Sequence, residues 1–294
     1  MSKKHSYLIN SLPYSRGNIK RGYNFVILNS FQDLLLFKNR LGIQIFIFSF
    51  LIFFIFSSQN SISKSATITF PSKDGLTITA DTYIFNPDKK TPFIVLFHQA
   101  GWSRGEYNEI APKLNKLGFN CMAVDQRSGG TVNGVQNETT VLAQKEGKPI
   151  NYTDTEKDII SSLEYAKKNF AEGKLIAWGS SYSAALVLKI AGDQPNLVNG
   201  VVSFAPGEYF KKLGKTPTWI QDSAKNIIVP VFITSAQSEY NNWAPIYGLI
   251  NTDTKTYYLP DTKGKHGSRA LWDKFFDSPG YWKAVTEFLI KNFQ

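Results

Sequence analysis

The sequence predicts an α/β fold in which a doubly wound, mostly parallel sheet carries an antiparallel hairpin at its N-terminal side. Two observations predict this fold. From about residue 65 onward, short continuous apolar runs alternate with amphipathic stretches, as strands buried on both faces alternate with helices. The first two strand-like segments instead alternate apolar and polar residues, which is typical of antiparallel strands. We therefore expect one domain over residues 65–294.

The order of the elements supports this fold. The hairpin strands are Ala66–Phe70 and Leu76–Phe85, joined by the turn at residues 72–75. Continuous apolar runs then predict buried strands at Phe93–Phe97, Cys121–Val124, Leu175–Trp178, Val198–Phe204 and Val229–Thr234, with a last strand-like run at Lys255–Leu259. Amphipathic periodicity predicts helices at Glu106–Leu117, Thr155–Phe170, Tyr182–Ala191 and Tyr281–Phe293. Strands joined by helices in this way place ligands at the carboxyl ends of the strands.

Composition excludes several classes of function. The chain has 294 residues, one Cys and three His, which leaves no Cys-based zinc site and no histidine cluster, so we expect neither a metal nor a cofactor. The net charge of +10 comes largely from residues 1–60, which hold seven basic residues and one acidic residue. The other charges are scattered without a basic, aromatic stripe, so we expect no nucleic-acid partner.

The N-terminal segment predicts export. Residues 1–42 are basic, and residues 43–58 form an apolar core inside a run from Leu41 to Ser63 that carries no charge. Such a run is either the apolar region of a signal peptide or an uncleaved membrane anchor. Both alternatives place the domain outside the cytoplasm, in the periplasm or beyond the cell, and any membrane contact comes only through this segment if it stays uncleaved.

The carboxyl end of the third buried strand carries a candidate nucleophile. The run Gly179-Ser-Ser-Tyr-Ser183 lies between a strand and a helix, where a serine on a tight turn is lifted clear of the sheet. Gly179 matches the first glycine of a G-x-S-x-G turn, and Ser183 stands where the second glycine is usual. Ser181 at the apex is the predicted nucleophile, and the neighbouring Ser180 is expected to face away from the cleft.

A serine hydroxyl needs a base to take its proton. The predicted domain contains only two histidines, and His266 follows the last strand-like run in a Gly-flanked loop, which makes it the expected base. His98 follows the first buried strand and is expected to shape a loop whose Gln99 or Ala100 amide stabilises an oxyanion. The amide of Tyr182, at the start of the helix, is the second expected donor.

The base needs a carboxylate to fix its tautomer. Glu239 is the first carboxylate in the loop after the strand Val229–Thr234, 27 positions before His266. Asp253 and Asp261 remain alternatives, since both lie between that strand and the histidine.

This order of oxyanion loop, serine turn, acid and histidine resembles the α/β-hydrolase family over roughly residues 65–294. The short connection between the strands ending near Phe204 and beginning near Val229 leaves little room for a lid, as in the dienelactone-hydrolase-like branch, although serine replaces the cysteine usual there. The resemblance implies hydrolysis of esters, thioesters or amides through an acyl-enzyme. Ser183 and Gln99 depart from the family's usual glycines.

These features predict a serine hydrolase acting on small carboxylic esters. Side chains expected to line the substrate pocket are His98, Trp102, Tyr240 and Trp243, with the glycine-rich, polar loop at residues 128–153 covering part of the cleft. A peptidase for short or N-terminal peptides is the alternative within the same fold. A binding protein without catalysis is the alternative outside enzymes.

Overall fold

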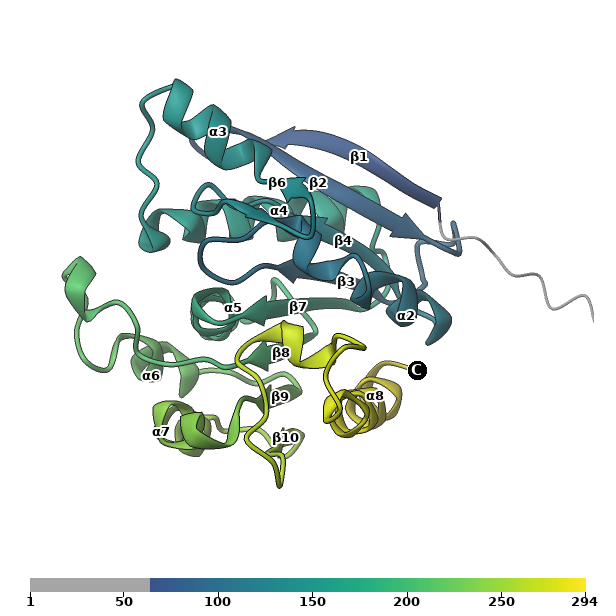
Figure 1. Cartoon of the computed structure of the whole chain (residues 1–294), viewed down its shortest axis with the longest axis vertical. Helices are drawn as coiled ribbons and strands as arrows, with labels where there is room; N and C mark the ends of the chain where they lie inside the picture. Colours follow the sequence, from purple (N-terminus) through teal and green to yellow (C-terminus); the bar gives the residue numbers. More distant parts are fainter. Residues whose placement is uncertain (1–63) are drawn as a thin grey trace, which may run out of the picture. The chain divides into compact units, whose positions relative to one another are not determined.

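The computed structural model describes residues 64–294, and an eight-stranded mixed sheet organises them (Figure 1). The strands lie in the order β1-β2-β4-β3-β7-β8-β9-β10. Their bounds are β1 Lys64–Pro71, β2 Thr77–Ile84, β3 Phe93–Phe97, β4 Asn120–Val124, β7 Leu175–Ser180, β8 Gly200–Phe204, β9 Val231–Thr234 and β10 Lys255–Tyr258. β1 pairs antiparallel with β2 and β2 antiparallel with β4, and the other neighbours are parallel. The predicted fold class is confirmed.

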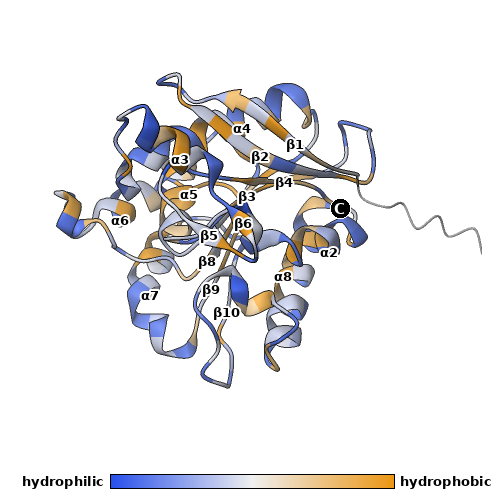
Figure 2. Cartoon of the chain, turned by 45° about the horizontal axis from the view of Figure 1, so that its top comes forward, coloured by the Kyte–Doolittle hydropathy of each residue, from blue (hydrophilic) through white to orange (hydrophobic). Residues whose placement is uncertain are grey.

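Helices cover both faces of the sheet, and the inner strands β4, β3, β7, β8 and β9 supply residues to two apolar cores. In β3, Phe93, Val95 and Phe97 enter the core beneath the helices α4, α5, α6 and α7. Ile94 and Leu96 enter the other core, beneath α2 and α8. Figure 2 shows apolar residues along these strands and inward helix faces, with hydrophilic residues in the outer turns. This double burial explains the continuous apolar runs in the sequence. The α-helices are α2 Ile110–Lys116, α3 Glu138–Lys145, α4 Glu156–Asn169, α5 Tyr182–Asp193, α6 Trp219–Ala224, α7 Tyr240–Leu249 and α8 Ser278–Phe293.

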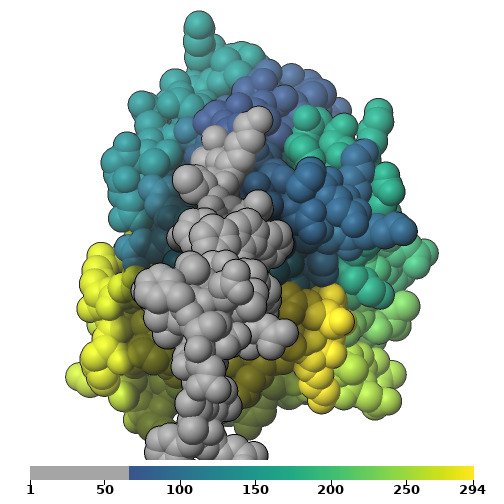
Figure 3. Space-filling view, turned by 90° about the vertical axis from the view of Figure 1, so that its right-hand side faces the viewer, coloured from purple at the N-terminus to yellow at the C-terminus, as the bar shows by residue number. Residues whose placement is uncertain are grey.

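The C-terminal helix α8 closes the second core. Its Tyr281, Val285 and Leu289 are fully buried. On the face shown in Figure 3, the yellow residues of α8 adjoin the blue residues of the early strands and α2. The Gln294 side chain there donates a hydrogen bond to the Leu117 carbonyl at the end of α2. The C-terminus is therefore fixed to the domain.

Two predicted segments differ from the structure. The helix expected from Glu106 begins only at Ile110, and a short 3-10 helix, η1 (Arg104–Tyr107), precedes it. Pro112 lacks an N–H and its ring conflicts with the carbonyl four residues earlier, so it is tolerated only in the first turn. The expected irregular loop at 128–153 instead contains the hairpin β5 (Thr131–Val132) and β6 (Val135–Gln136) followed by α3.

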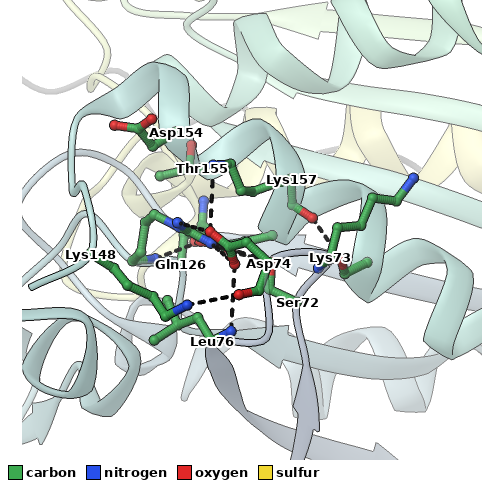
Figure 4. Close-up of polar contacts among 12 residues, drawn as sticks. Ser72, Lys73, Asp74, Leu76, Gln126, Lys148, Asp154, Thr155 and Lys157 are labelled. Carbon is green, nitrogen blue, oxygen red and sulfur yellow. Dashed lines mark hydrogen bonds and ion pairs between the residues drawn. The ribbon is translucent and has the colours of Figure 1, made fainter. Parts of the chain in front are cut away.

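A buried arginine ties the hairpin to the parallel part of the sheet. Arg127 is fully buried and pairs with Asp158 of α4 at 2.7 Å and with Asp74 of the β1–β2 turn at 2.7 Å. Figure 4 shows Asp74 and Ser72 facing this cluster, with Lys148 bonded to the Asp74 carbonyl. The nearby Asp125, just after β4, bonds Arg104 of η1 and not Arg127.

The predicted segments at 1–42 and 43–58 lie outside the described residues. Within residues 64–294, no helix has the length and apolar character needed to cross a bilayer.

Candidate active site

The serine turn lies where β7 ends and α5 begins. Ser181 has φ 60° and ψ −121°, a strained conformation for a residue other than glycine. Its amide donates to the Phe204 carbonyl of β8 at 2.7 Å, which holds the turn against the sheet. Gly179 has no room for a side chain, because a Cβ there would lie 2.4 Å from the Ser183 carbonyl oxygen. The sharp turn therefore requires glycine at 179 and presents the Ser181 hydroxyl above the sheet edge.

The histidine loop follows β10 and is fixed from two sides. Gly264 and Gly267 flank His266 with φ 66° and 71°, so the loop turns sharply on either side of the imidazole. The Tyr281 hydroxyl of α8 accepts from the Lys265 amide at 3.3 Å and donates to the Ser235 carbonyl at 3.0 Å. The conformation of the histidine loop is thus set by α8 and by the end of β9.

Glu239 ends the 3-10 helix η4 (Gln237–Glu239), directly after β9. One carboxylate oxygen, Oε2, accepts from the Ala236 amide at 3.0 Å and so caps the short helix. The other oxygen, Oε1, contacts His266 Nδ1 at 2.5 Å. The Gln237 amide also donates to the Lys263 carbonyl at 3.0 Å, which joins the acid loop to the histidine loop.

These three loops bring Ser181, His266 and Glu239 into one hydrogen-bonded chain. His266 Nε2 lies 2.8 Å from Ser181 Oγ while its Nδ1 faces the carboxylate. Asp253 and Asp261 are exposed and the imidazole contacts neither of them. The arrangement can take a proton from the serine hydroxyl and hold it on an imidazolium beside a carboxylate.

Two backbone amides near the serine turn are candidates for donating to an oxyanion. In the described chain, neither the Ala100 amide nor the Tyr182 amide at the start of α5 donates to a protein acceptor. The expectation that the Gln99 amide binds an oxyanion is wrong, because this amide already donates to Glu106 Oε2 at 2.8 Å. Of the two amides expected from the loop after β3, only that of Ala100 is left without a protein acceptor, so it remains the candidate donor.

His98 is a support beneath this loop, and its expected place in the pocket is wrong because the side chain is fully buried. Its Nε2 accepts from the Gln126 amide at 3.2 Å and lies 3.1 Å from the Asn137 amide nitrogen, so Nδ1 carries the proton and donates to the Gln99 carbonyl. Burial lowers the pKa of His98 to about 4, which keeps it neutral near pH 7. Ser183 donates to the His98 carbonyl at 2.6 Å and joins the serine turn to this loop.

The remaining expected pocket residues divide by exposure. Trp243 is fully buried in α7, where its indole donates to the Ser235 hydroxyl at 2.7 Å, so its expected contact with substrate is wrong. Tyr240 is 40% exposed and Trp102 is partly exposed, so both remain available to a ligand.

No metal site is present in the described part of the chain, where no three His, Cys, Asp or Glu side chains cluster with the spacing of a metal centre. The single cysteine, Cys121, is buried in β4 and its pKa is raised by that burial. This thiol therefore offers no reactive nucleophile.

Comparisons with known proteins relate the chain to hydrolases. The family model for serine aminopeptidases of family S33 matches residues 88–241, a stretch that includes Ser181 and Glu239 and ends before His266. A search of curated proteins gives no match.

Among solved structures, dienelactone hydrolase from Anabaena variabilis is 13% identical, with a TM-score of 0.61 over 79% of this chain and 100% of that chain. An esterase of Pyrococcus furiosus is 16% identical, with a TM-score of 0.58 over 80% of this chain and 95% of that chain. A cold-adapted esterase from an Arctic intertidal metagenomic library is 13% identical, with a TM-score of 0.56 over 81% and 97%. At these identities the likeness concerns the fold.

Proposed function

Since this chain belongs to the serine aminopeptidase (S33) family of α/β-hydrolases, we propose that it is a serine hydrolase that cleaves small carboxylic esters through an acyl-enzyme intermediate. The resemblance to α/β-hydrolases drawn from the sequence is confirmed by the family match and the fold. The observation that carries the proposal is the chain of contacts from Ser181 Oγ to His266 Nε2, 2.8 Å, and from His266 Nδ1 to Glu239, 2.5 Å.

In the proposed mechanism, His266 removes the proton from Ser181 as the hydroxyl oxygen attacks the ester carbonyl. The resulting oxyanion accepts hydrogen bonds from the amides of Ala100 and Tyr182, each contributing about 3–4 kcal/mol where such donors have been measured. The imidazolium then gives its proton to the departing alkoxide, which leaves as the alcohol. Water attacks the acyl-serine with His266 again as base, and the carboxylic acid and the free hydroxyl are released.

Glu239 supports both steps from the other side of the imidazole. Its oxygen at Nδ1 holds the tautomer in which Nε2 is free to accept the serine proton, and its charge stabilises the imidazolium. The second oxygen is held by the Ala236 amide, so the carboxylate has little freedom to turn away.

A second candidate is an aminopeptidase, because the matching family model carries that description. Release of an N-terminal residue needs a carboxylate that binds the substrate's ammonium group. Of the carboxylates near His266, Glu239 is bonded to the imidazole and Asp261 is exposed, whereas the histidine loop and the following turn carry three basic residues, Lys263, Lys265 and Arg269. This local charge repels an ammonium group and favours neutral or anionic esters. The segment between β8 and β9 holds only η3 (Lys211–Leu213) and α6, which suits small substrates.

The test is hydrolysis of p-nitrophenyl acetate and butyrate beside aminoacyl p-nitroanilides by the purified protein, together with labelling by a fluorophosphonate. We expect ester turnover that Ser181→Ala abolishes along with labelling. Ser238→Ala, which removes an exposed hydroxyl next to Glu239, serves as the matched control and is expected to keep both ester turnover and fluorophosphonate labelling. Turnover of the anilides alone favours the aminopeptidase. A folded protein that is inert to all three probes refutes a serine hydrolase and leaves the ligand-binding alternative.

We also propose that the domain works outside the cytoplasm, on the basis of the uncharged run at residues 41–63 in the sequence. Protease added to intact cells, or to cells with a permeabilised outer envelope, is expected to digest the domain while it spares a cytoplasmic marker. Protection equal to that of the marker refutes this location.

A further inference from the structure

A carboxylate outside the proposed triad lies buried beneath it. Glu106 of η1 is completely buried, and none of the steps proposed above uses it. Its Oε1 accepts from the Ser180 hydroxyl at 2.7 Å, and its Oε2 accepts from the Gln99 amide at 2.8 Å. Both oxygens are thus occupied by donors from two different loops, one after β3 and one at the end of β7.

The same network reaches a third loop through Ser180. The Ser180 oxygen accepts from the Ser268 amide at 2.9 Å, so the serine hydroxyl relays the contact from the carboxylate to the histidine loop. Ser268 is held in turn, because its own hydroxyl accepts from the Trp178 indole at 2.9 Å. The space between these loops is full, since a Cβ at Gly267 would lie 2.6 Å from Ser180 Oγ.

Each contact of this network lies one or two residues from a group in the proposed mechanism. Gln99 precedes the oxyanion donor Ala100, Ser180 precedes the nucleophile Ser181, and Ser268 follows the base His266 by two residues. Resting on the proposed function, we infer that Glu106 is a positioning residue that fixes the oxyanion loop, the serine turn and the histidine loop relative to one another. A shift of about 1 Å among these groups is enough to cost about 100-fold in rate.

The ionised form of Glu106 is the one that suits this role. A carboxylate accepts through both oxygens, whereas the protonated acid carries a hydrogen on one of them and loses or reverses one of the two contacts. Burial raises the pKa of Glu106 to about 7, against the lowering effect of its two hydrogen bonds. The basic groups that face it are Arg269 of η5 (Ser268–Leu271) and His266 of the histidine loop, and a positive charge on either favours the ionised form. Tyr107 on its own element and the neutral His98 behind Gln99 add no charge near pH 7.

Removing the charge while keeping the shape tests this assignment. In the full-length protein, Glu106→Gln keeps one acceptor oxygen and places an NH₂ group opposite either the Gln99 amide or the Ser180 hydroxyl. We expect kcat for p-nitrophenyl acetate to fall at least tenfold with KM changed less than threefold, because the network contacts loops and no substrate. We also expect the fall of kcat/KM at low pH to have a slope greater than one in the wild type, because two groups must lose a proton. In the variant the slope is expected to be one.

A second readout does not depend on turnover. Hydrogen–deuterium exchange is expected to be faster in Glu106→Gln for the peptides that contain Gln99 and Ser268, and unchanged for β8. Glu109→Gln, which removes an exposed carboxylate three positions along the chain, is the matched control and is expected to keep the wild-type kcat and exchange. Ser180→Ala keeps the carboxylate and its contact with Gln99 but removes the bonds of Ser180 to Glu106 and to Ser268, so exchange is expected to be faster at Ser268 and unchanged at Gln99.

The outcomes separate the two proposals. Active wild type with unchanged kcat, pH profile and exchange in Glu106→Gln overturns the positioning role and leaves the hydrolase intact. A wild type without ester turnover refutes the proposed function, and exchange then decides alone: unchanged protection at Gln99 and Ser268 overturns the role of Glu106. If Glu106→Gln does not fold, Ser180→Ala decides through kcat, because it frees the serine turn and the histidine loop from the carboxylate: an unchanged kcat overturns the positioning role.

Discussion

Arg127→Met is expected to destabilise the domain strongly, because it removes a buried charge and leaves its partner behind. Arg127 donates to Asp158 through Nε at 2.9 Å and through Nη2 at 2.7 Å, and it makes a bidentate contact with Asp74 at 2.7 and 2.8 Å. The Asp158 side chain has no exposed surface, whereas that of Asp74 is 29% exposed and regains water. After the change, Asp158 keeps only the Ser72 hydroxyl, at 2.8 Å, and a backbone amide as donors.

The magnitude follows from that burial. Removing one partner of a buried ion pair costs about 3–5 kcal/mol, a large fraction of the roughly 5–15 kcal/mol that stabilises a typical domain. Urea denaturation followed by tryptophan fluorescence measures it at pH 8. Lys283→Met breaks an exposed ion pair with Glu287 and is the control, with an expected cost of about 0.5 kcal/mol or less.

A double-mutant cycle with Asp158→Asn separates the ion pair from lost packing. Asp158→Asn removes the buried charge that Arg127→Met exposes, so the double variant is expected to lose clearly less stability than the sum of the single variants. A loss below about 1 kcal/mol for Arg127→Met, or strict additivity in the cycle, would refute the reasoning that this pair is the critical connection between the hairpin and α4.

Three further predictions concern the site. Gly179→Ala is expected to lower the free energy of unfolding by about 1–3 kcal/mol and to remove most of the ester turnover, because its Cβ meets the Ser183 carbonyl. Its control is Gly248→Ala in α7, where a Cβ has open space and is expected to add up to about 1 kcal/mol of stability. Equal urea midpoints for the two variants contradict this. Glu239→Gln is expected to lower kcat by about 10³–10⁴-fold in the p-nitrophenyl acetate assay, and a loss below tenfold excludes it as the triad acid. The difference in free energy of unfolding between the wild type and His98→Asn is expected to decline as the pH falls from about 6.5 to about 4. In this range the histidine binds a proton in the unfolded chain, whereas burial keeps it neutral in the folded domain. A difference that stays constant across this range contradicts a buried, neutral His98.

The strands and the order of the site loops were predictable because both depend on residues that are close together in the sequence. A strand covered by helices on both faces must be apolar throughout, so β3 was predicted at its exact bounds and β7 was missed only in its last two residues. The serine turn was predictable because its crowding demands small residues. The order of acid and base follows from strand order alone, which is why the sequence could indicate Glu239 and His266, two side chains that contact each other in the structure.

The segment at 128–153 was missed although it carried a local signal. Asn133 and Gly134 both have positive φ, 50° and 75°, which is the turn that an Asn-Gly pair forms between two strands. The Asn137 side chain then accepts from the Thr140 amide and caps α3. We interpreted the polar and glycine-rich composition as an irregular loop, and the short strands of two residues each gave no periodicity to correct this.

The contacts that could not be predicted are those between polar side chains far apart in the chain. Arg127 lies two residues from Asp125 in the sequence, yet it pairs with Asp158, 31 residues away on α4. His98 and Trp243 were placed in the pocket by their position near the sheet edge, yet full burial is decided by which loops pack over them. A linear pattern carries position along a strand and carries no information on what covers it.

Ser183 shows how an apparent departure from a motif becomes compatible with the site. The two small positions of the serine turn have different physical requirements. Gly179 faces backbone atoms 2.4 Å from where a Cβ would lie, so even a methyl group there forces the backbone of the turn to shift. At Ser183 the hydroxyl donates to the His98 carbonyl at 2.6 Å and accepts from Gln126 at 2.5 Å. A hydroxyl there satisfies two buried polar groups that a glycine would leave without this partner. His98 bonds the Gln99 carbonyl in the loop that carries Ala100, so Ser183 joins the serine turn to the proposed oxyanion donor. Glu106 binds the same loop through the Gln99 amide.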